Sequence, residues 1–245
     1  MKRYFWIIGL IAIFFSACQK GSNIDSPTGN ETGKGGSMAR FAIVGNYLYA
    51  VDNNTLKVFD ISVPAYPVYL KSKNIGNGIE TIFPKDSLLF IGTQIGMLIF
   101  ELTNPTNPLQ ISSYQHIYSC DPVVADDKYA YVTLHSAGSR CGRTTNELHI
   151  VDISNIQNPV GRATYQMTSP MGLGIDGNLL FVCDDGLKVY NASDPLNLVL
   201  KSHFHIKAFD VIPYQNNLMV IGDDGLYQYK YQNDTIYPQS KIVFE

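Results

Sequence analysis

The side chains able to do chemistry in this sequence are dispersed acids, arginines and histidines, with no compact motif that joins them. Carboxylates about 5 to 9.5 Å apart can hydrolyse glycosidic bonds, so paired acids would suit a glycan-active enzyme. No Walker loop, dinucleotide fingerprint or EF-hand loop is present. We therefore expect no cofactor, no metal and no assigned catalytic residue. The expected binding residues are Arg40, Glu80, Tyr118, Asp121, His135, Arg140, Arg143, Asp184, Asp185, His205, Lys207 and Asp210.

One long irregular loop, residues 135–147, carries two of these arginines together with Cys141. Loops of this kind on a rigid scaffold are often functional. In an oxidising compartment Cys141 is predicted to form a disulfide with Cys120, and closing a loop of about 20 residues would contribute on the order of 3 kcal/mol. A nucleophilic Cys141 served by His135 is the alternative, although a flexible loop does not fix that geometry. Cys183 is expected to be a buried thiol.

His203 and His205 alternate along a predicted strand, a spacing that metal sites use. No third ligand is identifiable, so surface histidines are the better interpretation.

The N-terminus predicts export and lipid attachment. Lys2 and Arg3 precede an apolar run over residues 4–15, which is too short for the roughly 20 residues that span a bilayer. Residues 15–18 (Phe-Ser-Ala-Cys) resemble the bacterial lipoprotein box. We therefore expect a signal peptide over residues 1–17 and acyl chains such as palmitate on Cys18. Because Gln19 comes next, lipoprotein sorting rules favour the outer membrane, facing either the periplasm or the cell surface.

Residues 18–37 come after the cleavage site and are rich in Gly, Ser, Thr and Asn. They are expected to be a flexible tether, with a mean span of roughly 25 Å.

Composition restricts the class of the chain beyond the tether. The protein has 245 residues and a net charge of -3, which argues against a nucleic-acid binder built on a basic surface. Hydrophobic residues make up 45% and charged residues only 16%, with 16 Tyr and 12 Phe. The chain beyond the tether should be folded and rich in strands.

A repeat organises residues 38–245. Its clearest copies are residues 56–62 (Leu-Lys-Val-Phe-Asp-Ile-Ser) and 148–154 (Leu-His-Ile-Val-Asp-Ile-Ser). Weaker copies occupy residues 97–103, 187–193 and 226–232, and a last strand is expected over residues 240–244. An apolar strand precedes each copy, and a hairpin signal precedes all but the third, which carries the insertion. A proline-containing turn comes after all but the fifth. A period near 40 residues made only of short strands predicts an all-β fold, a five-bladed β-propeller of four-stranded antiparallel blades.

Several predicted strands, such as residues 41–44 and 181–183, are apolar on both faces. Stacking of neighbouring blades would bury those faces, and a closed ring would leave no terminal blade exposed. The motif, together with its proline turn, resembles the LVIVD repeat family of bacterial and archaeal surface propellers. That resemblance covers residues 38–245 and implies the fold, with no general reaction. Glu101 and Asn191 depart from the motif, and the fifth copy lacks the acid.

If each blade runs outward from its innermost strand, the expected binding residues collect on one face of the ring. We expect a binding or scaffolding module for a protein or glycan partner in the bacterial envelope, rather than an enzyme. The alternative is a glycosidase-like enzyme with carboxylates from Glu80, Asp121 and Asp210 at the channel.

Overall fold

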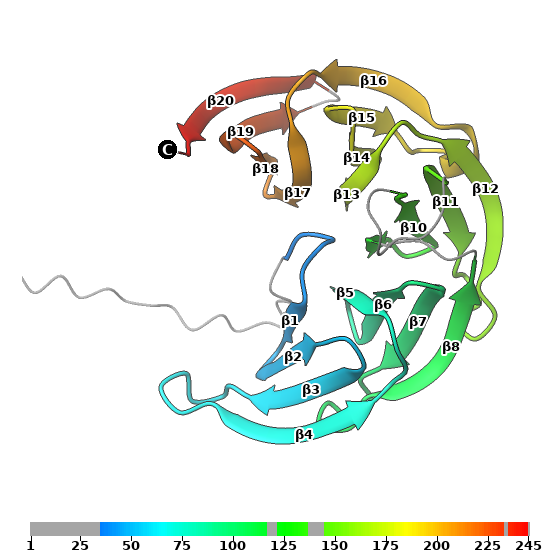
Figure 1. Ribbon diagram of the computed structural model, residues 1–245, viewed down its shortest axis with the longest axis vertical. Coiled ribbons are helices and arrows are strands. Elements are labelled where there is room, and N and C mark those ends of the chain that lie inside the picture. Colours follow the sequence, from blue (N-terminus) through cyan, green and yellow to red (C-terminus); the bar gives the residue numbers. More distant parts are fainter. Residues whose placement is uncertain (1–34, 117–121, 137–144, 233–234, 245) are drawn as a thin grey trace, which may run out of the picture.

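The computed structural model describes residues 35–116, 122–136, 145–232 and 235–244 as five four-stranded antiparallel sheets, each with its strands in sequence order (Figure 1). Each sheet is a blade, and its first strand is innermost. Within these residues no helix is long and apolar enough to cross a membrane. Blade 1 comprises β1 (Phe41–Val44), β2 (Tyr47–Val51), β3 (Thr55–Asp60) and β4 (Val68–Asn74). Blade 2 comprises β5 (Ile79–Lys85), β6 (Leu88–Thr93), β7 (Gly96–Glu101) and β8 (Leu109–Gln115).

The other three blades repeat this arrangement. Blade 3 comprises β9 (Val123–Ala125), β10 (Tyr129–Leu134), β11 (Glu147–Asp152) and β12 (Val160–Gln166). Blade 4 comprises β13 (Pro170–Asp176), β14 (Leu179–Asp184), β15 (Leu187–Asn191) and β16 (Val199–Phe204), with a short 3-10 turn at Pro195–Asn197. Blade 5 comprises β17 (Ala208–Tyr214), β18 (Asn217–Gly222), β19 (Gly225–Gln232) and β20 (Thr235–Val243). The predicted five blades of four antiparallel strands are confirmed, although the last strand begins five residues before the expected residue 240.

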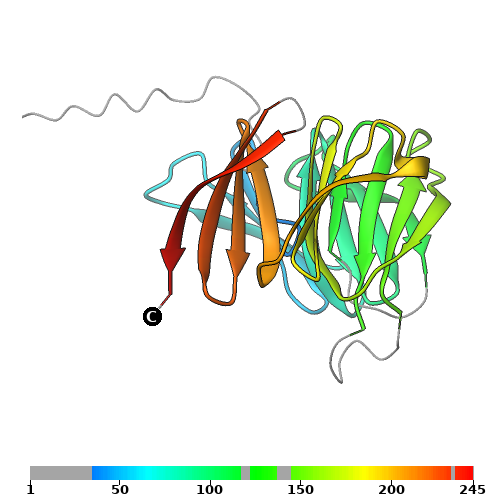
Figure 2. The same cartoon turned by 90° about the horizontal axis from the view of Figure 1, so that it is seen from above.

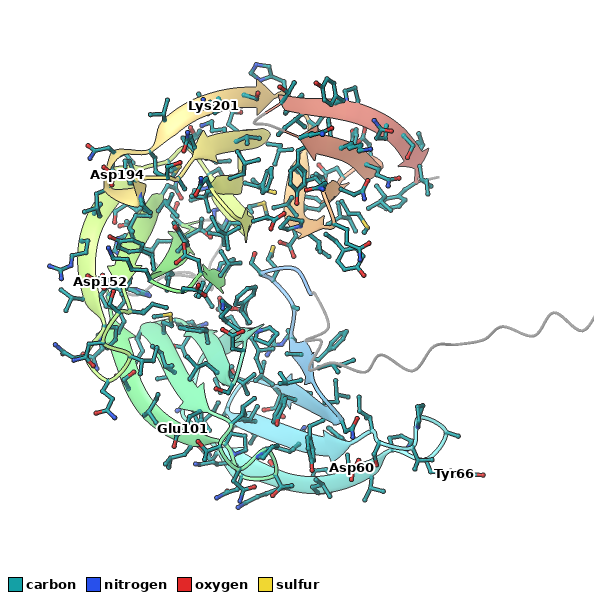
Figure 3. The ribbon with its side chains drawn as sticks, turned by 180° about the vertical axis from the view of Figure 1, so that it is seen from behind. Asp60, Tyr66, Glu101, Asp152, Asp194 and Lys201 are labelled. Atoms are coloured by element: carbon teal, nitrogen blue, oxygen red, sulfur yellow. The ribbon has the colours of Figure 1, made fainter. Side chains whose placement is uncertain are left out.

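The acid near the end of the repeat motif has a local physical role. In blade 1 the Asp60 Oδ1 accepts a hydrogen bond of 2.8 Å from the backbone N–H of Ser62, and Asp152 does the same for Ser154 at 3.0 Å. Asn191, the departure in blade 4, makes the equivalent bond. Such a side chain ends the strand and starts the turn. Figure 3 shows Asp60 and Asp152 toward the outer rim of their blades.

Neighbouring blades share apolar cores, as the two-sided strands predicted. Four clusters of buried side chains lie between blades 1 and 2, 2 and 3, 3 and 4, and 4 and 5. Fully buried members include Leu56, Phe90, Tyr131 and Phe181. Each blade therefore buries its oily faces against its neighbours, which is the main source of stability in such a stack.

The ring that the sequence predicted is not closed. Among the described residues no buried cluster joins blade 5 to blade 1. In the same part of the chain, no strand of blade 5 packs extensively against a strand of blade 1. Figure 1 shows the five blades as an arc, with blade 5 and blade 1 standing apart. The expectation of closure was wrong because the curvature set by four well-packed boundaries does not bring the end blades together.

The strands run between two faces of the arc, which Figure 2 shows from the side. We call one the site face; it holds the turns between second and third strands and the connections between blades. The opposite face holds the turns between first and second strands and the loops after the repeat motif. This assignment results from the strand order and agrees with the sequence-based arrangement.

Residues 35–39, which we call the axial segment, run between the inner strands. Gly35 lines a cavity on the opposite face, whereas Met38 lines one on the site face. Ser37 between them has no exposed surface. Composition assigns residues 35–37 to the flexible tether, and the structure shows instead that they belong to the folded body.

Hydrogen bonds hold the axial segment to blades 4 and 5. The Ser37 hydroxyl donates to Asp210 Oδ1 over 3.0 Å and accepts from the Leu173 N–H over 2.8 Å. The Met38 N–H donates to Asp210 Oδ2 over 3.2 Å. A Cβ at Gly36 would lie 2.0 Å from an Asp210 oxygen, so only glycine allows the chain to pass there.

Candidate functional site

Three of the expected binding residues meet at the mouth of the channel on the site face. Arg40, Glu80 and His135 line a cavity of about 480 Å³ that we call the mouth cavity. Its other lining residues are Met38, Asn53, Ile79, Thr81, Gln94, Pro122 and Met171. These three residues share one face because the starts of the first strands, near Arg40 and Glu80, and the ends of the second strands, near His135, lie at the same face.

Hydrogen bonds position the two charged residues of the mouth cavity. Arg40 Nη2 donates to the Ile79 carbonyl oxygen over 3.1 Å, which fixes one nitrogen of its guanidinium. Gln94 Nε2 donates to Glu80 Oε1 over 3.2 Å. Opposite charges, two amides and two methionine side chains therefore surround one opening, a lining suited to a ligand with several hydrogen-bonding groups.

His135 adds a titratable group to the same cavity. Burial lowers the pKa of its imidazole, because a partly dry environment disfavours the charged form. At neutral pH the ring is therefore uncharged and can both donate and accept a hydrogen bond.

A second cavity of about 400 Å³ adjoins the first, and Met171 lines both. It contains three more of the expected residues, Asp185, His205 and Lys207. The Lys207 ammonium lies 3.5 Å from a carboxylate oxygen of Asp223 and its side chain is 77% exposed, so it remains accessible to a ligand. We call the two cavities together the site-face cavities.

The two histidines at the end of β16 lie at the surface, as expected, with their ring planes tilted by 52° to each other. The rings of His203 and His205 have centroids 4.2 Å apart. His203 Nε2 donates to the Asp185 carbonyl oxygen over 2.6 Å. No group of three or more His, Cys, Asp or Glu side chains in the described ranges is arranged to hold a metal ion.

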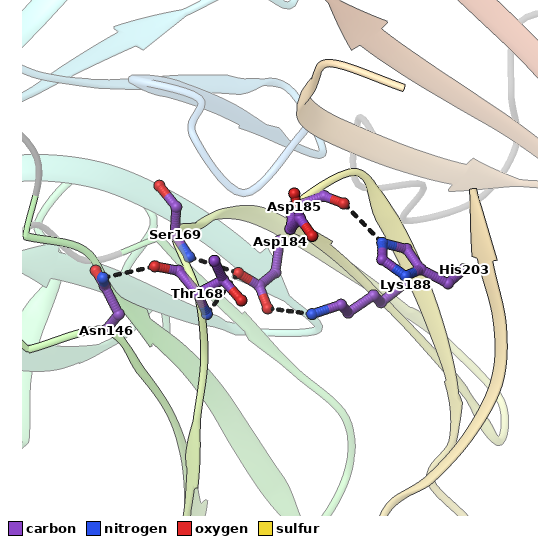
Figure 4. A network of polar contacts seen from close by, with 7 residues as sticks. All are labelled: Asn146, Thr168, Ser169, Asp184, Asp185, Lys188 and His203. Carbon is purple, nitrogen blue, oxygen red and sulfur yellow. Dashed lines mark hydrogen bonds and ion pairs between the residues drawn. The ribbon is translucent and has the colours of Figure 1, made fainter. Parts of the chain in front are cut away.

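Asp184 is a structural residue, which corrects its nomination as a ligand contact. Its side chain has no exposed surface and accepts hydrogen bonds from the N–H groups of Thr168 and Ser169, at 2.9 and 2.6 Å. The Lys188 ammonium lies 2.7 Å from its other oxygen. Figure 4 shows these contacts, which leave the carboxylate surrounded by the chain's own donors.

Asp210 is also occupied by the protein, although the sequence offered it as an acid at the channel. Both its oxygens bond to the axial segment, and Oδ1 also accepts from the Val211 N–H over 2.9 Å. Burial raises the pKa of its carboxyl group, because desolvation outweighs these hydrogen bonds.

Asp52, an acid in the hairpin turn of blade 1, bonds within that turn. Asp52 Oδ1 accepts from the Thr55 N–H and hydroxyl at 2.9 and 2.8 Å, and the bonds to Lys57, Thr55 and Asn54 lower the pKa of its carboxyl group. In the neighbouring position Asn53 lines the mouth cavity. Sequence reasoning attended to the acids of these turns and missed the amides Asn53 and Gln94, which the same hairpin pattern could have indicated.

The remaining nominations lie outside the described residues. These are Cys18, Tyr118, Cys120, Asp121, Arg140, Cys141 and Arg143, so the disulfide, the lipidation and the arginine loop remain predictions. Cys183 is described, and it is a buried free thiol whose pKa burial raises well above its usual value.

A cavity of about 490 Å³ on the opposite face was not foreseen. Its lining includes the apolar side chains of Phe83, Leu173 and Pro213 and the carboxylates of Asp126 and Asp176. Neighbouring tyrosine hydroxyls donate to both carboxylates, Tyr131 to Asp126 and Tyr231 to Asp176. Many of its lining residues lie in or beside the turns between first and second strands. No sequence motif marked those turns as a site.

A partly buried polar cluster between blades 2 and 3 was also missed. Glu147 Oε2 lies 2.8 Å from His149 Nε2, and the other ring nitrogen of His149 lies 3.4 Å from the Tyr114 hydroxyl. Burial lowers the pKa of His149 despite the adjacent carboxylate. These contacts link the outer strand of blade 2 to β11.

Comparison with known proteins agrees with this architecture. The family model described as the LVIVD repeat matches residues 35–74 and 141–166, which contain the two clearest copies of the motif. None of the curated proteins matches the sequence. The structure resembles a protein from Lactobacillus plantarum, with a TM-score of 0.64 and 11% identity over 81% of this chain and 68% of that one.

Two further solved structures have the same fold. The periplasmic gluconolactonase of Pseudomonas aeruginosa gives a TM-score of 0.62 at 12% identity, covering 81% of this chain and 68% of that chain. BamB from Moraxella catarrhalis gives a TM-score of 0.54 at 9% identity, covering 82% of this chain and 60% of that chain. The chain thus spans about two thirds or less of the chains it resembles. This protein is a β-propeller, and the LVIVD repeat model matches it within blades 1 and 3.

Proposed function

We propose that this propeller is a binding or scaffolding module of the bacterial envelope, which holds a protein or glycan partner on its site face. The observation that carries the proposal is the pair of adjoining site-face cavities. Blades 1, 2 and 3 bring Arg40, Glu80 and His135 there, and the connection between blades 4 and 5 brings His205 and Lys207. Concave sites with a few converging polar groups are where propellers and other rigid scaffolds bind ligands.

The position of the N-terminus supports an outward orientation of this site. The chain enters the fold at Gly35 on the opposite face and reaches the site face only at Met38. With a lipid on Cys18 and a short tether, the opposite face would lie nearer the membrane. The site face would then point toward the compartment from which a partner arrives.

Binding is a better account of the site face than glycoside hydrolysis. A glycosidase needs two carboxylates that reach the substrate across a pocket. Asp210 is bonded through both oxygens to the axial segment, and one oxygen of Glu80 accepts from Gln94. Asp121, the third candidate acid, lies outside the described residues. The likeness to a gluconolactonase shows the fold and transfers no reaction.

The test uses the full acylated chain in detergent or nanodiscs, since residues 35–37 are part of the fold. Binding to a glycan array and to outer-membrane extracts is compared between the wild type and a His205→Ala/Lys207→Ala double variant. We expect the double variant to lose at least about tenfold in affinity for any partner found, because two accessible polar contacts are removed. The matched control is Lys128→Ala, which changes a lysine on the opposite face.

The control should bind as the wild type does. If the His205→Ala/Lys207→Ala variant also binds every partner as the wild type does, the site is elsewhere and the proposal is wrong. Release of reducing sugar from a bound glycan would instead favour the enzyme.

A further inference from the structure

The two ends of the arc expose apolar sheet faces of the kind that every other blade boundary buries. On blade 1 the side chains of Ala42, Tyr49 and Val58 face blade 2. Successive residues of a strand point to opposite sides, so Phe41, Leu48 and Phe59 face the gap. Phe41 is 59% exposed.

Cross-strand pairing places Leu48 and Phe59 in one row, and Phe41 lies in the row beside it, paired with Ala50. Ile43 pairs with Leu48, Leu48 with Phe59, and Phe59 with Tyr69. The rings of Phe59 and Tyr69 lie edge to face with centroids 5.5 Å apart. Blade 1 therefore presents a continuous apolar ladder to the gap, which we call the blade 1 end face.

Blade 5 presents a second ladder on its side of the gap. Leu218, Val220 and Tyr229 pack toward blade 4, which turns Ile221 and Leu226 the other way. Ile221 pairs with Leu226, and Leu226 with Ile242. Ile221 is 43% and Ile242 62% exposed. We call this row, with the adjacent pair of Ile212 and Met219, the blade 5 end face.

An uncapped stack of repeats needs something to cover such ends, because terminal repeats with apolar outer faces associate in water. The end faces are also complementary in kind. Each of blades 1 to 4 packs one sheet face against the blade that follows it in sequence. The blade 5 end face is the equivalent face of the last blade, and no blade covers it. The blade 1 end face corresponds to the face with which blades 2 to 5 receive the preceding blade.

We propose that a second copy of this protein covers these faces, with the blade 5 end face of one copy packed on the blade 1 end face of the next. The contact continues the boundary that already joins successive blades, so it requires no partner of different chemistry. Because the two faces differ, the contact is heterologous and each copy keeps one face free. Assemblies larger than a dimer therefore form as concentration rises.

The test measures molar mass by light scattering and sedimentation over a range of concentrations, with the full acylated chain in nanodiscs that hold one copy each. Phe41→Glu places a charge on the blade 1 end face, and Ile221→Glu places one on the blade 5 end face. Both side chains are partly exposed, so folding should survive, and circular dichroism with the unfolding midpoint checks this. Leu109→Glu is the matched control, since Leu109 is 54% exposed on the outer strand of blade 2.

We expect wild type and Leu109→Glu to grow in mass with concentration, and each end-face variant alone to remain monomeric. An equimolar mixture of the two variants should form dimers and stop there, because one undamaged copy of each face remains between them. Dimers of wild type that only one variant abolishes would indicate a two-fold contact and overturn the head-to-tail arrangement. Wild type that remains monomeric at every concentration would overturn the proposal, and would leave the end faces to a different polypeptide.

Discussion

The boundary between blades 4 and 5 and the gap between blades 5 and 1 involve the same kind of sheet, yet they are held differently. Between blades 4 and 5 lies a full apolar core, in which the rings of Phe181 and Tyr231 have centroids 5.2 Å apart. Across the gap the described connection is the axial segment, with Ser37 and Met38 bonded to Asp210. One boundary depends on buried apolar area, and the other on a few polar contacts at the channel.

This difference shows that a repeat defines a blade more firmly than it defines a ring. Burying a large apolar side chain contributes about 1.5 to 3 kcal/mol, and a typical hydrogen bond about 0.5 to 1.5 kcal/mol net. A row of buried side chains therefore fixes the angle between two blades, whereas the axial segment can only tether the ends of the arc. Single substitutions can separate the two kinds of boundary, and the largest effect is expected in the apolar core.

Phe181→Ala should damage the boundary between blades 4 and 5 severely. Phe181 has no exposed surface, and truncating a buried phenylalanine leaves a cavity that costs about 3 to 5 kcal/mol of unfolding free energy. Phe41→Ala, on the gap side of blade 1, should cost less than about 0.5 kcal/mol in a monomeric sample. Urea unfolding at low protein concentration measures both, and equal losses would show that the gap is closed in solution.

Asp210→Ala should have an intermediate effect because it removes the acceptor that holds the axial segment. The Ser37 hydroxyl and the Met38 N–H lose a partner inside the fold, which costs about 1 to 3 kcal/mol. Hydrogen exchange should show faster exchange at residues 36–39, with protection of the core strands between blades 2 and 3 unchanged. Unchanged exchange in the axial segment would mean that Asp210 does not hold it.

The pH dependence of stability should reveal the buried carboxyl group of Asp210. Its pKa is raised in the folded state, so the fold favours the protonated form, and the penalty for the charged form applies above the folded pKa. As the pH falls from 7 through that pKa, the unfolding free energy of the wild type should rise relative to that of Asp210→Asn. The expected rise is smaller than the unfolding free energy that Asp210→Ala loses. The check is the difference in unfolding free energy between the two proteins from pH 7 to pH 4, and a constant difference would contradict the raised pKa.

Lys207→Ala should have the smallest effect, less than about 0.5 kcal/mol. Its ion pair with Asp223 is exposed and 3.5 Å long, and water and salt screen such pairs. Thermal unfolding at low and high salt measures the change. A loss above about 1 kcal/mol would show that Lys207 supports the fold, so that its substitution could not report on binding alone.

Particular residues show how far sequence reasoning reached. The copies of the repeat motif match β3 and its equivalents to within two residues at each end, because period-two patterning and turn residues act locally. It also brought Arg40, Glu80 and His135 to one mouth, since strand order alone determines which strand ends share a face. It failed for Asp184 and Asp210, whose carboxylates look available in the sequence but bond to Thr168, Ser169 and the axial segment.

The sequence by itself determined five blades of four strands, the direction of each blade and the face on which the candidate residues gather. These features depend on alternation, turn chemistry and repeat length, which are all readable along the chain. Only the tertiary structure decided that the arc stays open, that residues 35–37 enter the channel and that Asp184 and Asp210 are occupied. Each of these depends on contacts between residues far apart in sequence, where small packing angles accumulate and backbone donors reach side chains that no local pattern pairs with them.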